Sequence, residues 1–216
     1  MLWLWIGIAV VVVIVVAAVV AIVSSGGDED LSVGSVPPSG ETIAPGGESK
    51  GEVWPVTVSG TALTPLPQEG TDPGTGETAP TISGFAFDGS PVTLDWSKGP
   101  TMVVVVAHWC PHCNVEVPEL VAWKNSGEVP PELQVIAIST NANPQAPNYP
   151  PSEWLKDKGW TWPVLADDEN SSAAQAMGVS FFPYVAIIGT DGKVLTRWSG
   201  EKGQDAIDAM VDAALA

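Results

Sequence analysis

Basic residues are scarce in this 216-residue chain, where 8 Lys and Arg stand against 25 Asp and Glu for a net charge of −17. Binding to a nucleic-acid backbone requires basic side chains that displace counterions, so this composition argues against a nucleic-acid partner. Attraction to anionic lipid headgroups is disfavoured for the same reason. The length predicts one folded domain with appended segments, or two very small domains.

Cysteine is also rare, because Cys110 and Cys113 are the only two in the chain. Two cysteines cannot build the disulfide framework of a small secreted domain or a four-cysteine zinc site. A bridge between them would close a loop too short to add much chain-entropy stabilisation, since that contribution grows with loop length. A disulfide at this position is therefore better explained by function than by stability.

Residues 2–23 contain no charged or polar side chain. As a helix rising 1.5 Å per residue this segment reaches about 33 Å, enough for a bilayer core of about 30 Å. A cleaved signal peptide is the alternative, but such peptides have a shorter apolar run and a basic start. Because no Lys or Arg precedes Lys50, we predict an uncleaved, single-pass transmembrane helix that anchors the chain in the membrane.

Residues 24–80 hold 11 Gly and 8 Pro, a density without periodicity that is typical of a flexible linker. Within it, residues 52–59 are β-prone and include an aromatic side chain. Pro55 would confine such a strand to the edge of a sheet, since proline donates no ladder hydrogen bond. The sequence leaves open whether this stretch packs on the following domain or forms a transiently ordered patch.

From residue 81 the pattern becomes regular, and a Val-rich apolar run at residues 101–107 predicts a buried central strand. The turn signals Asp88-Gly89 and Asp191-Gly192 each predict a hairpin. Other strands are expected at 82–87, 91–94, 133–139, 162–165, 184–188 and 193–198, with helices at 111–123, 151–158, 171–177 and 204–215. This order predicts an α/β domain over 81–216 with a mixed β-sheet flanked by helices.

The two cysteines lie where the central strand ends and a helix begins. Unpaired backbone N–H groups and the helix dipole favour an anion at that point, so Cys110 is the candidate nucleophilic thiolate. Cys113, one turn further along, is placed to close a disulfide with it.

The order of hairpin, Val-rich strand, Trp109-Cys110-x-x-Cys113 and helix resembles the thioredoxin fold, and in detail the membrane-tethered TlpA/ResA-type redoxins. Glu116 matches the active-site glutamate of that family, and Pro118 matches the proline within its active-site helix. Phe182-Pro183 matches its cis-proline segment, which faces the two cysteines. The resemblance covers about residues 79–215.

The resemblance implies a thiol–disulfide oxidoreductase in which Cys110 attacks, Cys113 resolves the mixed disulfide and Glu116 accepts a proton. Its redox-active disulfide would be the electron carrier, so no organic cofactor is implied. Substrates would be protein cysteine pairs lying beside Phe182-Pro183, with a further redox partner, and the protein would be a monomer. This chemistry needs a disulfide-permissive compartment, so we expect the domain on the extracytoplasmic side of the cell membrane.

The sequence departs from thioredoxin in ways that bear on this chemistry. Val104 stands where thioredoxin has a buried Asp, so Glu116 is the candidate for the buried proton carrier. The dipeptide between the cysteines is Pro111-His112, the DsbA type. If His112 donates a hydrogen bond to the Cys110 thiolate, it stabilises the reduced form and raises the reduction potential above the thioredoxin value of about −270 mV. Trp109 is expected to form a wall beside the thiol.

A metal-binding or copper-delivery module on the same fold is the alternative function. His108, Cys110, His112 and Cys113 are four soft or borderline ligands within six residues, suited in kind to zinc or copper. The strand-to-helix geometry points the two imidazoles away from each other, so we predict no metal site. A peroxidase would need a peroxidatic cysteine behind Pro and Thr, a pattern that is absent here.

Overall fold

The computed structural model describes residues 52–216. The predicted anchor at 2–23 and the first part of the predicted linker, residues 24–51, lie outside the described residues. Within 52–216, none of the helices combines the length and the apolar character needed to cross a membrane.

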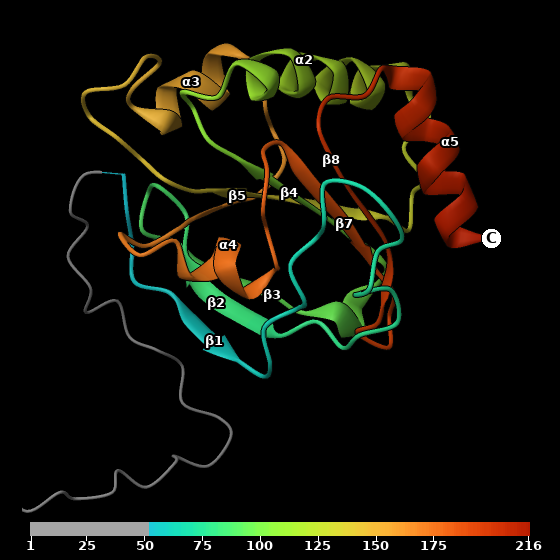
Figure 1. The fold of residues 1–216 in the computed structure, drawn as a ribbon. Helices are drawn as coiled ribbons and strands as arrows, with labels where there is room; N and C mark the ends of the chain where they lie inside the picture. Colours follow the sequence, from blue (N-terminus) through green and yellow to red (C-terminus); the bar gives the residue numbers. More distant parts are fainter. Residues whose placement is uncertain (1–51) are drawn as a thin grey trace, which may run out of the picture. The chain divides into compact units, whose positions relative to one another are not determined.

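One mixed β-sheet organises the described residues, in the strand order β1-β2-β6-β5-β4-β7-β8, with β3 paired to β2 (Figure 1). Its strands are β1 Thr57–Ser59, β2 Thr81–Phe85, β3 Pro91–Leu94, β4 Thr101–Val106, β5 Gln134–Ser139, β6 Val164–Ala166, β7 Tyr184–Ile188 and β8 Val194–Ser199. The helices are η1 Trp96–Lys98, α2 Pro111–Ser126, α3 Pro151–Asp157, α4 Ser172–Ala176 and α5 Gln204–Leu215. The α/β architecture with a mixed sheet is the one that the sequence predicts.

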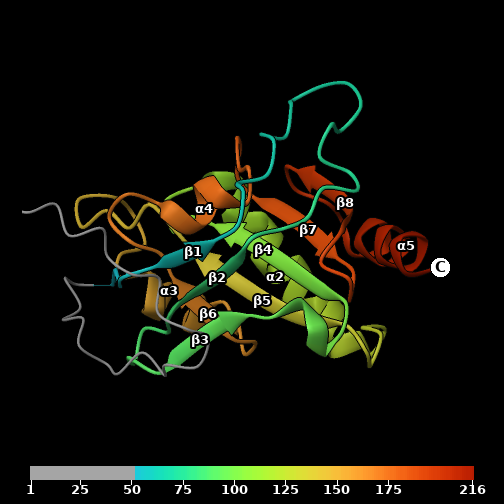
Figure 2. The same ribbon diagram turned by 90° about the horizontal axis from the view of Figure 1, so that it is seen from below.

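Strand β4 lies in the middle of this sheet, parallel to β5 and antiparallel to β7 (Figure 2). All six of its residues are buried. Because alternate side chains point to opposite faces, Val104 and Val106 contribute to one core and Val103 and Val105 to the other. This two-sided burial explains why the strand appears in the sequence as an uninterrupted apolar run.

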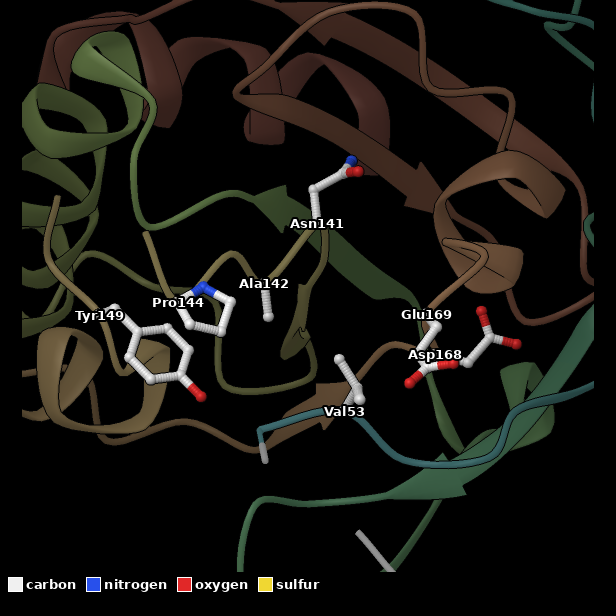
Figure 3. A pocket seen from close by; sticks show the side chains of 7 residues that line it. All are labelled: Val53, Asn141, Ala142, Pro144, Tyr149, Asp168 and Glu169. Atoms are coloured by element: carbon white, nitrogen blue, oxygen red, sulfur yellow. The ribbon is translucent and has the colours of Figure 1, made fainter. Parts of the chain in front are cut away.

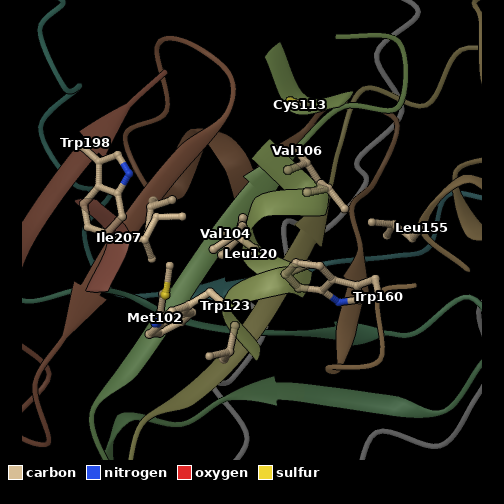
Figure 4. Packing of buried hydrophobic residues seen from close by; sticks show 14 of the residues in the cluster. Met102, Val104, Val106, Cys113, Leu120, Trp123, Leu155, Trp160, Trp198 and Ile207 are labelled. Carbon is tan, nitrogen blue, oxygen red and sulfur yellow. The ribbon is translucent and has the colours of Figure 1, made fainter. Parts of the chain in front are cut away.

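Helices α2, α3 and α5 cover one face of the sheet, while α4 lies on the other (Figure 1). The first core is filled by side chains of α2 packed on β4, among them Leu120 and Trp123 beside Val104 and Met102 (Figure 4). Cys113 belongs to the same core. The second cysteine is therefore held by the main packing layer of the domain.

Residues 52–80 pack on this domain, although their composition assigns them to the linker. Strand β1 pairs antiparallel with β2, and Leu63 and Leu66 are buried in the second core. Arg197 of β8 forms a bidentate ion pair with Asp72 and donates a hydrogen bond to Thr64 O at 2.8 Å. After β1, Gly and Pro prevent regular helix or strand as far as residue 77, but they do not prevent burial of the few apolar side chains between them.

Candidate active site

The two cysteines sit at the junction of β4 and α2, as the sequence predicts. Cys110 is the N-cap residue of α2, and its Sγ accepts the backbone N–H of Cys113 at 3.4 Å. Both thiols are free. An N-cap position places Sγ against the first backbone amides of the helix, at the positive end of its dipole.

The two thiols differ in their surroundings. Cys110 keeps 5% of its surface exposed, whereas Cys113 is completely buried. Burial, together with the nearby Cys110 and Glu116, raises the pKa of the Cys113 thiol far above its usual range. The geometry therefore offers Cys110 for attack and keeps Cys113 protonated behind it.

The segment before β7 faces the first thiol at the end of β4, the strand beside β7. The Phe182–Pro183 peptide bond is cis, as expected from the resemblance. Cys110 Sγ lies 3.7 Å from the carbonyl oxygen of Phe182. The Phe182 ring makes an edge-to-face contact with Trp109, with 6.1 Å between ring centroids. Trp109 and Phe182 thus form an aromatic wall next to Cys110, which places Trp109 as predicted.

Glu116 lies one turn after Cys113 on the buried side of α2 and is completely inaccessible to solvent. Its Oε2 accepts the backbone N–H of Lys202 at 2.6 Å, while Oε1 has no hydrogen-bond partner among residues 52–216. Burial raises the pKa of this carboxyl group to about 7 from its usual 4.5, although the Lys202 N–H opposes the shift. A group with that pKa can both take and return a proton near neutral pH.

His112 lies away from the thiol rather than hydrogen-bonded to it. Its ring is exposed, and Nδ1 donates to Glu201 Oε2 at 3.1 Å. Pro111 occupies the first turn of α2, where its missing N–H leaves no bond unmade. The hydrogen bond from His112 to Cys110 that motivated a raised reduction potential is not formed, because the partner of His112 comes from the loop after β8.

His108 is buried and uses both ring nitrogens within the protein. Its Nε2 accepts the N–H of Asn143 at 3.0 Å, so Nδ1 carries the proton that is donated to Pro147 O at 2.7 Å. Neither nitrogen is left to ligate a metal. Among residues 52–216, no cluster of three or more His, Cys, Asp or Glu side chains is arranged to hold a metal ion.

The loop Gly200–Gly203 is part of the site that sequence reasoning missed. Glu201 contacts His112, Lys202 N–H holds Glu116, and Gly200 N–H donates to Pro183 O at 2.9 Å. This loop therefore joins the active-site helix to the cis-proline segment. No local sequence motif predicts that this loop belongs to the site, because its partners are up to 89 residues away in the chain.

A pocket of about 260 Å³ opens near the carboxyl ends of β5 and β6 (Figure 3). It is lined by Val53, Asn141, Ala142, Pro144, Tyr149, Asp168 and Glu169. It contains no cysteine. The Trp109 indole N–H donates to Asn141 O at 2.9 Å, so a hydrogen bond links the aromatic wall of the site to a residue that lines this pocket.

Comparison with known proteins gives a consistent result. Residues 74–215 match the Redoxin family. Thiol:disulfide interchange protein HelX of Rhodobacter capsulatus is 27% identical over 111 residues, which cover 51% of this chain and 57% of HelX. The chain thus aligns with little more than half the length of that relative.

Solved structures agree on the fold. A thiol:disulfide interchange protein of the thioredoxin family from Chlorobium tepidum TLS is 25% identical, with a TM-score of 0.51 covering 65% of this chain and 97% of that one. A secreted Mycobacterium tuberculosis disulfide oxidoreductase homologous to E. coli DsbE is 19% identical, with a TM-score of 0.52 covering 61% and 94%. The domain has the thioredoxin-like fold.

Proposed function

The chain belongs to the Redoxin family, and on that premise we propose that it is a thiol–disulfide oxidoreductase that acts through Cys110 and Cys113. One observation carries the proposal. An N-cap thiol faces the cis-proline segment, with a second, fully buried thiol one helical turn behind it. A pair of structural cysteines would need neither the difference in burial nor the placement at a helix N-terminus.

The exchange takes place in two steps that conserve electrons. The Cys110 thiolate attacks one sulfur of a substrate disulfide, forming a mixed disulfide and releasing the other substrate sulfur as a thiolate that takes up a proton. The Cys113 sulfur then attacks Cys110 Sγ, closes the Cys110–Cys113 disulfide and releases the second substrate thiolate. Two electrons pass to the substrate, and the reverse sequence oxidises a substrate dithiol.

Glu116 serves the second step. Its spacing of three residues from Cys113 puts both side chains on one face of α2, within the same buried layer. The Cys113 thiol must lose its proton to attack, and the buried carboxylate with its raised pKa is the acceptor. The disulfide itself carries the electrons, so the proposal requires no organic cofactor and no metal.

The order of attack is tested by trapping. In Cys113→Ser, the mixed disulfide on Cys110 cannot be resolved, so substrate proteins should accumulate as adducts that a reductant releases. Non-reducing electrophoresis followed by mass spectrometry identifies them. In Cys110→Ser no adducts should form. The opposite pattern would reverse the two assignments, and adducts in neither variant would contradict the proposed activity.

We place this activity outside the cytoplasm, with residues 2–23 as a single-pass membrane anchor. The support is the uncharged apolar segment together with a chemistry that suits a disulfide-permissive compartment. A protease added to intact cells or protoplasts should remove the domain from the membrane. Complete protection until lysis would place the domain on the inner side.

The substrates that we propose are cysteine pairs in other proteins, presented as an extended segment along Phe182–Pro183. An extended chain there can pair with exposed backbone as an added strand. A separate redox partner would restore the starting state of the cysteines, and the protein would act as a monomer.

A further inference from the structure

A groove of about 700 Å³ is lined in part by Phe182, whose carbonyl oxygen lies 3.7 Å from Cys110 Sγ. One wall is the segment of residues 66–72, which lies next to β8 (Figure 1). The other wall combines Phe181 and Phe182 with the end of β8 and the loop after it. His112 stands at the boundary between the groove and the α2 N-terminus. A chain that enters this groove therefore approaches Cys110 from the side of the cis-proline segment.

The charges along the groove are unequal. Asp72 and Arg197 neutralise each other in a bidentate ion pair, with the Arg197 side chain wholly buried. Glu201 is 45% exposed, and its side chain pairs with the exposed ring of His112, with no other hydrogen-bond or ion-pair partner among residues 52–216. While that imidazole is neutral, the Glu201 carboxylate is the uncompensated charge among the groove's lining residues.

We infer that this groove binds an extended segment of the substrate protein and that Glu201 selects segments carrying a Lys or Arg next to the reacting cysteine. The inference rests on the proposed function and names its substrate class. The exposed Phe181 ring, 42% accessible, offers an apolar contact for a neighbouring side chain of the same segment. The net charge of −17 also draws cationic partners toward the protein.

Glu201 is well placed for this role because its loop belongs to the active site. Gly200 N–H is bonded to Pro183 O, which fixes the loop against the segment where the substrate backbone lies. A basic side chain that displaces the His112 ring replaces the imidazole hydrogen bond to Glu201 with an ion pair. Glu201 is thus a specificity-determining residue rather than a catalytic one.

The test compares two disulfide-linked peptides that differ only in having Lys or Glu beside the cysteine. The full-length reduced protein is assayed at pH 8, where free imidazole is neutral, and at low and high salt. We expect kcat/KM to favour the Lys peptide by roughly three- to tenfold at low salt, as an exposed ion pair replaces a like-charge contact. At about 0.5 M salt the preference should fall by at least half.

Three variants make the assignment specific. Glu201→Gln should abolish the preference, and Glu201→Lys should invert it in favour of the Glu peptide. Glu132→Lys is the control, because Glu132 is exposed and precedes β5 at the opposite end of the sheet. It makes the same charge change and should leave the preference intact.

Each other outcome overturns the inference in a distinguishable way. Equal turnover of both peptides, or a preference that survives in Glu201→Lys, refutes the role of Glu201 and leaves the proposed function standing. Failure to reduce either peptide refutes both. Concentration-dependent dimers that dissociate when the Lys peptide is added would assign the groove to a second copy of this chain.

Discussion

Replacing Glu116 by Gln should remove a strong pH dependence of stability. Burial raises the pKa of this carboxyl group from about 4.5 to about 7, so between these values the folded state binds a proton that the unfolded state has lost. A raised carboxyl pKa makes the free energy of unfolding fall as pH rises through this window. The shift corresponds to a loss of about 3 kcal/mol in the free energy of unfolding, almost all of it between pH 4 and pH 8.

The Gln side chain keeps an oxygen that can accept the Lys202 N–H, and its amide adds a pH-independent offset. The observable is therefore the difference between pH 4 and pH 8 and not the absolute stability. Urea unfolding of the reduced chain can be followed by tryptophan fluorescence, since eight of the ten tryptophans lie within residues 52–216. Wild type should lose about 3 kcal/mol more than Glu116→Gln over this range.

The control is Glu132→Gln, which changes an exposed carboxylate and should follow the wild-type curve. If wild type and Glu116→Gln show the same pH dependence, Glu116 is ionised at ordinary pH in the fold. It would then be a poor proton acceptor for Cys113, and the proposed second step would lose its carrier.

Two further predictions concern what holds the site in place. Asp72→Asn should lower the free energy of unfolding by about 3 kcal/mol at pH 7, because it leaves the buried Arg197 guanidinium without its carboxylate. Burial alone would raise the pKa of Asp72, but the hydrogen bonds and charge of Arg197 outweigh it and lower this pKa. The stabilisation is therefore present above the ordinary carboxyl pKa and is lost as pH falls. If Asp72→Asn lowers the free energy of unfolding by less than 1 kcal/mol, this ion pair does not hold residues 60–80 on the domain. His108→Ala should accelerate hydrogen exchange of the Asn143 backbone amide, because it removes the imidazole nitrogen that accepts this N–H. Unchanged exchange at Asn143 would mean that the loop at 141–149 is held without His108.

Much of the fold follows from local sequence patterns. The uninterrupted Val run predicts β4 as a buried strand, and the last helix is found at 204–215, as predicted. The position of Cys110 at the helix start follows from where the apolar run ends. These features depend on periodicity, turn residues and capping, which act over a few neighbouring positions and are therefore visible in one sequence.

The surroundings of the cysteines required the tertiary structure. Burial of Glu116 under the Lys202 amide, and the pairing of His112 with Glu201, join residues 86 and 89 positions apart. The sequence identified Glu116 and His112 as residues of interest but assigned His112 the wrong partner, because an exposed side chain at a helix start can reach several neighbours.

Local sequence patterns are enough to place most strands and helices of residues 81–216 and the junction that holds the two thiols, and the family resemblance adds the proline that faces them. The burial of Glu116 beneath the Lys202 amide and the place of residues 66–72 in the groove wall follow only from the three-dimensional packing. Capping and periodicity are local, whereas burial and charge compensation depend on packing between segments as far apart as Thr64 and Arg197.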